Sequence, residues 1–357
     1  MAWMLERYVA RKILLATLAV MMAAAALVYV VSFLGELRQV GEGDYGLLQA
    51  ALYALLELPF NVSQFFPMLV LLGGLSGLGI LAAHQELVVM RVSGLSPGGF
   101  MRGVLFAGVL LSVLGLGVGE AAAPRLHYIA NMRKTMDLSG GQAVVTQSGL
   151  WVHQQNSFIH IRQISAHHHL EGITRYAFDS DHRLLSAEYA DSMDLQNGQW
   201  VVHQPVRTVF SGSTRAVSES AKNAVWDVQL NPVVLNAGLI EPEEIPLDRL
   251  RLYTRHLVRN GMQAVDFQFS YARRSLRPLA IVVMLFLALP FVFVPPRTLS
   301  PGLRLFLGVL SGFVFYILNT LLGQLSVIFQ LSPWLSALFP IALFAALDVW
   351  LLRRIFR

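Results

Sequence analysis

The chain has 357 residues, 55% of them hydrophobic and 14% charged, whereas an ordinary soluble domain carries roughly 45–50% apolar and about 25% charged residues, so the composition indicates a membrane protein. Cysteine is absent, which excludes disulfides, thiolate nucleophiles and Cys-liganded metal centres. The net charge of +5 would suggest nucleic acid for a soluble domain, but the arginines lie largely beside apolar segments, so we interpret the excess as a signal of topology and expect no nucleic-acid partner.

Six membrane-spanning helices are predicted, because one span needs about 20 mostly apolar residues. They are residues 13–35, 58–83 with a start near Phe65, 103–119 continuing to Pro124, the segment between Pro278 and Pro296, and two spans within 305–347 broken near 324–333. An even number of spans places both termini on one side of the membrane.

The distribution of cations predicts that this side is the cytoplasm. The cytoplasmic segments would then carry Arg7, Arg11, Lys12, Arg91, Arg102, Arg297, Arg304, Arg353, Arg354 and Arg357. The two short external loops would carry only Arg38, as the positive-inside rule requires. The region between the third and fourth spans then faces the outside, and a long translocated domain is exempt from that rule.

The external region is predicted to be all-β. It holds 27 of the 49 charged residues between Arg125 and Asp266. Short alternating runs separated by Gly, Asn and Asp indicate an antiparallel sandwich or jelly roll. The expected strands are 149–152, 157–163, 174–178, 184–194, 200–210 and 224–229. An amphipathic connector helix is expected at 247–260, ended by Gly261, with its leucines against membrane or protein.

The predicted organisation is therefore a multi-pass α-helical membrane protein with a periplasmic, jelly-roll-like β domain inserted between transmembrane helices 3 and 4. Residues 1–124 would hold helices 1–3, residues 125–266 the β domain with its connector helix, and residues 267–357 helices 4–6.

No catalytic or metal-binding motif is found. The lysines are Lys12, Lys134 and Lys222, and none follows a glycine, so the phosphate-binding GxxxxGK[ST] loop is absent and this chain is not expected to hydrolyse ATP. A GxSxG nucleophile elbow is also absent. The three histidines at 167–169 would point in different directions and lack acidic or cysteine partners, so we expect no metal site there.

The cytoplasmic link between the second and third spans predicts a short helix at about 84–94. It contains Glu86, Leu87, Val88, Val89, Met90 and Arg91 and is closed by Gly94. An apolar helix with one acid, held close to the membrane, fits a groove on a cytoplasmic partner. The alternative is an interfacial helix that places its leucine and valines in lipid.

At these residues the chain resembles the lipopolysaccharide export permease family, LptF/LptG. The run 86–90 with Ser93 and Gly94 is preceded by Phe65, Phe66 and Pro67. Further short motifs follow the family's order, namely GEGDY at 41–45, GE at 119–120, GLW at 149–151, YAF at 176–178 and GFVFY at 312–316. The run 87–94 favours the LptG type over the paralogous LptF type.

This resemblance implies a permease subunit of an ATP-driven ABC transporter in the bacterial inner membrane. Such a transporter extracts lipopolysaccharide from the outer leaflet and passes it to a periplasmic bridge of jelly-roll domains. The implied partners are an LptF-type permease, an LptB ATPase dimer that holds the ATP and Mg²⁺, the single-span LptC and lipopolysaccharide itself. This chain would bind no cofactor, and the segment 86–94 would dock on LptB.

A lipopolysaccharide extractor needs an apolar cavity capped by cations, because lipid A carries acyl chains below its phosphates, and arginine binds phosphate bidentately. The headgroup candidates are Arg38, Arg133, Lys134, Arg273, Arg274 and Arg277. Alternatively, these cations snorkel or bind other anionic headgroups. Phe65, Phe66, Phe313 and Phe315 are expected to contribute to the apolar cavity.

Two roles are possible for four polar residues in or near the spans. Glu57, Glu120, Asn319 and Asp348 form either an ion pathway or interfacial and interhelical contacts, and the carboxylates' positions toward span ends favour the second reading. Two other functions remain open for the whole chain. One is a relay between a cytoplasmic ATPase and a periplasmic partner without lipid transport, and the other is a membrane enzyme or sensor that uses the external histidines.

Overall fold

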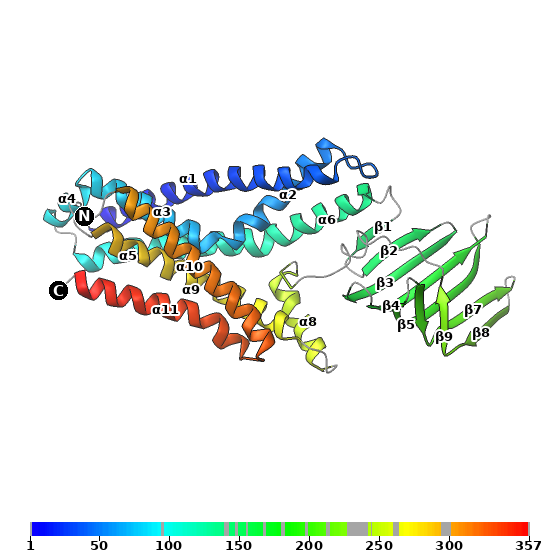
Figure 1. Ribbon diagram of the computed structural model, residues 1–357. Coiled ribbons are helices and arrows are strands. Elements are labelled where there is room, and N and C mark those ends of the chain that lie inside the picture. Colours follow the sequence, from blue (N-terminus) through cyan, green and yellow to red (C-terminus); the bar gives the residue numbers. More distant parts are fainter. Residues whose placement is uncertain are drawn as a thin grey trace. The chain divides into compact units, whose positions relative to one another are not determined.

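The computed structural model describes residues 2–93, 96–138, 143–146, 149–154, 156–166, 169–179, 183–196, 199–211, 215–226, 242–243, 245–259, 264–293 and 301–355. Within these ranges six helices are long and apolar enough to cross a membrane, which confirms the predicted number. In chain order these spans contain α1 (Ala2–Glu36), α3 (Phe66–Ala83), α5 (Pro97–Leu116), α9 (Val265–Phe293), α10 (Pro301–Ile328) and α11 (Pro333–Ile355) (Figure 1).

The start of the second span and the break between the last two spans lie where they were predicted. The second span, α3, begins at Phe66, directly after Phe65 and with Pro67 in its first turn. The last two spans, α10 and α11, are separated at residues 329–332, within the predicted window. A helix not foreseen, α2 (Leu47–Gln64), precedes α3, and the short turn η1 (Leu37–Gln39) follows α1.

The third span is longer than predicted. After α5 the helix continues through one π-helical turn, η2 (Gly117–Ala122), into α6 (Ala123–Leu138), although Pro124 was expected to end it. Proline lacks the N–H that closes a regular α-turn, and its ring displaces the preceding turn. The π turn ends at Ala122, two residues before Pro124, and interrupts the regular ladder there. The predicted domain boundary at 124/125 therefore falls inside a continuous helix.

Glycines allow a close helix contact between α1 and α3. A Cβ atom added at Gly77 would lie 3.0 Å from the Cα atom of Ile13, and one added at Gly73 would overlap Thr17. Membrane helices associate through such close backbone approaches, because lipid offers no hydrophobic driving force between them.

The centre of the bundle is formed by α3 and α9. Leu71 and Leu78 of α3 and Ile281, Met284 and Leu285 of α9 are all fully buried. α1 and α10 are the least buried spans. Their long apolar faces are therefore left for lipid or for a second membrane protein.

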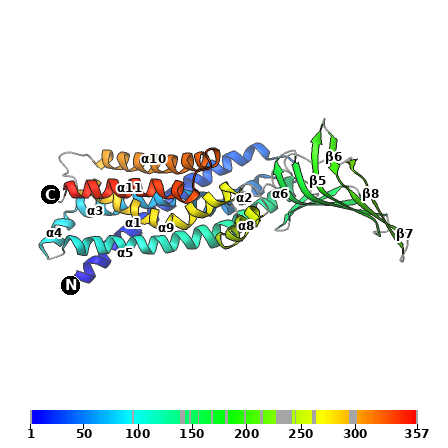
Figure 2. The same cartoon turned by 90° about the horizontal axis from the view of Figure 1, so that it is seen from below.

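Between α6 and α8 the described strands form one antiparallel sheet. The strands are β1 (Ala143–Thr146), β2 (Gly149–Gln154), β3 (Ser157–Ala166), β4 (His169–Phe178), β5 (Leu184–Gln196), β6 (Gln199–His203), β7 (Val206–Ser211), β8 (Arg215–Ser220) and β9 (Asn223–Trp226). The order is β1-β2-β3-β4-β5-β6-β9, with β7 paired to β5 and to β8. Figure 2 shows how strongly this sheet bends.

The β domain agrees with the predicted all-β class, and it differs in two details. The expected strand 200–210 is divided into β6 and β7 at Gln204, which has a φ of 50°, and Pro205, which cannot donate a ladder hydrogen bond. β1 and β8 were not predicted. One face of the sheet is apolar, as the alternation requires, and the two tryptophans Trp200 and Trp226 are buried there. The connector helix, α8 (Leu247–Arg259), matches its predicted range.

Candidate functional site

The short helix α4 (Glu86–Val92) lies at the end of the bundle where both termini are found (Figure 1). It corresponds to the predicted segment 84–94. A sharp corner separates it from α3, because Gln85 has a φ of 57°, a left-handed conformation that costs a non-glycine residue roughly 1–2 kcal/mol. Gly94 and the side chain of Arg91 lie outside the described part of the chain.

The two faces of α4 differ in burial. Met90 is buried and Leu87 partly buried against the apolar core of the bundle. Val88, Val89 and Val92 are 61%, 62% and 84% exposed. Because these three valines lie on one side of the helix, they form a small exposed apolar strip, which fits either a protein-binding surface or contact with lipid.

Polar contacts attach α4 and its surroundings to α1. The Tyr8 hydroxyl of α1 donates to Glu86 Oε2 at 2.9 Å. Two residues earlier in α1, Glu6 pairs with Arg102 of α5 at 3.0 Å. α5 itself starts with a capped turn, since the Ser96 hydroxyl accepts a hydrogen bond from the Gly99 amide at 3.1 Å. A movement of α1 would therefore be transmitted to the helix that carries the valine strip.

At the opposite end of the bundle, Arg274 is fully engaged within the chain. Its Nε donates to Glu120 Oε1 at 3.0 Å, its Nη2 donates to Glu120 Oε2, and its Nη1 donates to the Ile245 carbonyl at 2.6 Å. The arginine side chain is only 3% exposed. Arg274 thus holds α9 to η2 and to the connector before α8. The expected headgroup contact of Arg274 stays a prediction.

The other two arginines of the predicted cluster lie in different surroundings. The guanidinium of Arg273 lies 5.8 Å from the ring centroid of Phe269. Arg277 lies beside Gly119 of η2, where an added Cβ would come within 2.5 Å of its Nη1. Both side chains are half-buried. The three arginines therefore do not form one exposed patch.

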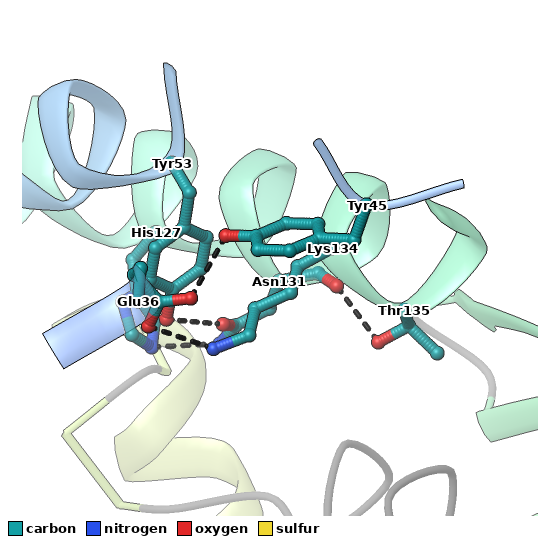
Figure 3. Close-up of polar contacts among 7 residues, drawn as sticks. All are labelled: Glu36, Tyr45, Tyr53, His127, Asn131, Lys134 and Thr135. Carbon is teal, nitrogen blue, oxygen red and sulfur yellow. Dashed lines mark hydrogen bonds and ion pairs between the residues drawn. The ribbon is translucent and has the colours of Figure 1, made fainter. Parts of the chain in front are cut away.

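Lys134 of α6 is likewise held by the chain (Figure 3). Its Nζ donates to Glu36 Oε1 at 2.8 Å and lies 4.4 Å from the ring centroid of Tyr53. The Tyr45 hydroxyl donates to the other carboxylate oxygen of Glu36, also at 2.8 Å. Both charged side chains are largely buried, at 18% and 13% exposure. An ion pair thus joins the end of α1 to α6, and the expected headgroup contact of Lys134 stays a prediction.

Further hydrogen bonds extend this cluster along α6. The Tyr53 hydroxyl donates to Asn131 Oδ1 at 3.2 Å, and Asn131 Nδ2 lies 2.9 Å from His127 Nε2 (Figure 3). The Thr135 hydroxyl donates to the Asn131 carbonyl at 2.8 Å. Together these contacts fix α2 and the end of α1 against α6. Arg133, next to Lys134, and Arg38 of η1 are exposed and keep their charges at the surface.

The four phenylalanines predicted to line a cavity are divided by the structure. Phe66 and Phe315 are 1% and 3% exposed and belong to the core of the bundle, so they do not line a surface of this chain. Phe65 is half-buried, with its ring centroid 5.0 Å from that of Tyr316. Phe313 of α10 is 52% exposed.

Sequence reasoning missed three residues that organise these sites. Tyr8 carried no signal, and Tyr45 was noted only as part of the GEGDY motif, because a tyrosine near a span end is expected at any membrane interface. Glu36 was detectable as the acid that ends the uncharged first span opposite the cations of α6. Glu120 was assigned an interhelical role, and its contacts with Arg274 are of that kind.

Comparison with known proteins agrees with this architecture. The family model described as lipopolysaccharide export system permease LptF/LptG matches residues 7–354. The lipopolysaccharide export system permease protein LptG of Escherichia coli strain K12 is 32% identical over 352 residues, covering 98% of each chain. The protein of the same name from Haemophilus influenzae is 30% identical over the same length and coverage. This chain, a multi-pass membrane protein with a β domain between its third and fourth spans, belongs to the LptF/LptG family of lipopolysaccharide export permeases.

Proposed function

We propose that this chain is the LptG-type permease subunit of an ATP-driven exporter that extracts lipopolysaccharide from the outer leaflet of the inner membrane. It passes the lipid to a periplasmic bridge toward the outer membrane. The LptG type rather than the LptF type is supported by the relatives named above, all of which are LptG proteins.

In this proposal both termini and α4 are cytoplasmic, and the β domain is periplasmic. The cations at the α4 end support this orientation. Arg7, Arg11 and Lys12 lie in the first turns of α1, and Arg353 and Arg354 lie in the last turn of α11. Such an excess marks the cytoplasmic side of a membrane protein.

The exposed strip of Val88, Val89 and Val92 is the observation that carries the proposal. α4 is attached to the bundle by Met90 and Leu87, so its valines present an apolar surface that moves with the membrane helices. An LptB ATPase dimer, which holds the ATP and Mg²⁺, would dock here. Closure of the ATPase would then press the helices together and expel the bound lipid.

The remaining partners follow from the uncovered surfaces. An LptF-type permease would cover the apolar faces of α1 and α10 and complete the lipid cavity, to which Phe313 contributes from its exposed position. LptC would add its single span beside this pair. The exposed Arg38 and Arg133 and the half-buried Arg273 are the cations best placed for headgroup phosphates, because Arg274 and Lys134 are engaged within the chain.

Substitution of one valine tests the coupling surface directly. Val89→Asp places a carboxylate where an apolar contact is proposed, and loss of one buried valine corresponds to about 1.5–3 kcal/mol, or roughly 10- to 150-fold weaker binding of LptB. Val225→Asp, at a residue 58% exposed in β9, is the matched control. Affinity for LptB and lipopolysaccharide-stimulated ATP hydrolysis are measured in reconstituted complexes. Equal affinities for the two variants would refute the assignment of α4.

A further inference from the structure

α8 is a basic amphipathic helix with one face held by the bundle. Leu250 is fully buried, and the ring centroid of Tyr253 lies 5.1 Å from that of Phe267 in the first turn of α9. On the other side, Arg251 and Arg255 are exposed and Leu252 is 66% exposed. Residues four apart lie on one helix face about 6 Å apart, so the two arginines form a pair with an apolar side chain beside them.

The level of α8 relative to the bilayer follows from the aromatic residues of the bundle. Tyr271 of α9 contacts Trp334 of α11, with 6.1 Å between the ring centroids, and Trp334 is 50% exposed at the start of the last span. Tryptophan and tyrosine gather where hydrocarbon meets headgroups. Phe267 lies four residues before Tyr271, which is about 6 Å further along the helix axis.

The turn between α10 and α11 supports the same position for the membrane surface. Ile328, Phe329 and Leu335 are 70%, 66% and 69% exposed, and exposed side chains this apolar mark contact with lipid or with another membrane protein. The headgroup layer outside the hydrocarbon is roughly 5–8 Å thick on each side. A helix one turn beyond the Tyr271–Trp334 contact therefore lies within that layer.

We propose that the exposed face of α8 binds the phosphate groups of anionic phospholipids, with Arg251 and Arg255 as the phosphate ligands and Leu252 among the acyl chains. The planar guanidinium donates two parallel hydrogen bonds to a phosphate. Among the described residues, no carboxylate forms an ion pair with either arginine, although Asp248 lies on the same helix.

The shape of the surface favours a phospholipid over lipopolysaccharide as the occupant. A phospholipid presents one phosphate above two acyl chains, which fits two arginines and one leucine on an open helix face. A glycolipid with several acyl chains must be enclosed to be extracted, whereas Arg251, Leu252 and Arg255 are all exposed. The bound phospholipid would hold α8 in the headgroup layer and so fix the start of α9.

The test is lipid retention by the full-length protein in nanodiscs. Wild type is compared with an Arg251→Gln, Arg255→Gln double variant in phosphatidylcholine discs that contain phosphatidylglycerol, lipopolysaccharide or neither. Bound lipid is counted by native mass spectrometry. An Arg183→Gln, Lys222→Gln double variant, which removes two exposed cations of the β domain, is the matched control.

We expect roughly 30-fold weaker retention of phosphatidylglycerol by the α8 variant, which corresponds to about 1 kcal/mol for each arginine near an anionic surface. Retention should also weaken with added salt in wild type. The control variant and the retention of lipopolysaccharide should be unchanged. Unchanged phosphatidylglycerol retention, or a loss confined to lipopolysaccharide, would overturn the proposal.

Discussion

The buried ion pair between Glu120 and Arg274 supplies a quantitative prediction about what holds the bundle together. Glu120→Ala leaves the arginine, whose side chain is 3% exposed, without its carboxylate partner. Breaking one partner of a buried pair costs about 3–5 kcal/mol, because a desolvated charge remains uncompensated. Since Glu120 is itself 16% exposed, water can enter the vacated space, and we expect the lower end of that range, about 3 kcal/mol.

Two further variants separate this effect from a general loss of packing. Glu6→Ala breaks an ion pair whose arginine is 68% exposed, so it should cost at most about 1 kcal/mol. Glu120→Leu combined with Arg274→Met removes both charges. Removing both charges should recover part of the stability that Glu120→Ala loses. The recovery is reduced by about 1–3 kcal/mol, because the Ile245 carbonyl loses its hydrogen-bond donor.

Stability is measured by denaturant unfolding in mild detergent, followed by tryptophan fluorescence. The reasoning is wrong if Glu120→Ala is as mild as Glu6→Ala. It is also wrong if the double variant is less stable than Glu120→Ala alone, because the uncompensated arginine would then not be the cause.

Three other variants follow from local geometry. Gly73→Val should lower the melting temperature by forcing α1 away from α3, at a cost of about 1–3 kcal/mol or more, whereas Gly79→Val, at a site with nothing within 4 Å, should leave it nearly unchanged. Lys134→Met should destabilise the protein by about 1–3 kcal/mol, because the Glu36 carboxylate loses its cationic partner. Arg133→Gln, at the exposed neighbouring position, should change the free energy of unfolding by no more than about 0.5 kcal/mol. Equal unfolding midpoints for the two variants would contradict the buried pair. Tyr8→Phe removes one hydrogen bond to α4, worth about 0.5–1.5 kcal/mol, and should reduce lipid-stimulated ATP hydrolysis more than it reduces the binding of LptB.

The spans were predictable because the cost of burying charge in hydrocarbon leaves a simple signature. Long uncharged runs and the prolines near their ends identified the six helices, and the break before Pro333 followed from length alone. The predicted third span was too short, because a proline usually ends a helix and the prediction therefore ended at Pro124. Its continuation depends on the π turn at Gly117–Ala122, a local rearrangement that composition does not reveal.

The site was predictable as a list of residue types but not as a set of contacts. α4 was identified, because an apolar segment with one acid between two spans is unusual. Arg274 and Glu120 form an ion pair although they are 154 positions apart in the sequence, and no local sequence pattern predicts such a pair. Phe66 and Phe315 were placed on a cavity because hydrophobicity alone does not tell which face of a helix turns inward.

The export claim is tested most directly by purifying the tagged protein from its native membrane in mild detergent and identifying its partners by mass spectrometry. The proposal predicts three companions, namely a P-loop ATPase, a second six-span permease and bound lipopolysaccharide. Val89→Asp should lose the ATPase and keep the permease. Recovery of the ATPase and the permease without any glycolipid, in wild type and under conditions that preserve other bound lipids, would contradict the account and favour a relay without lipid transport.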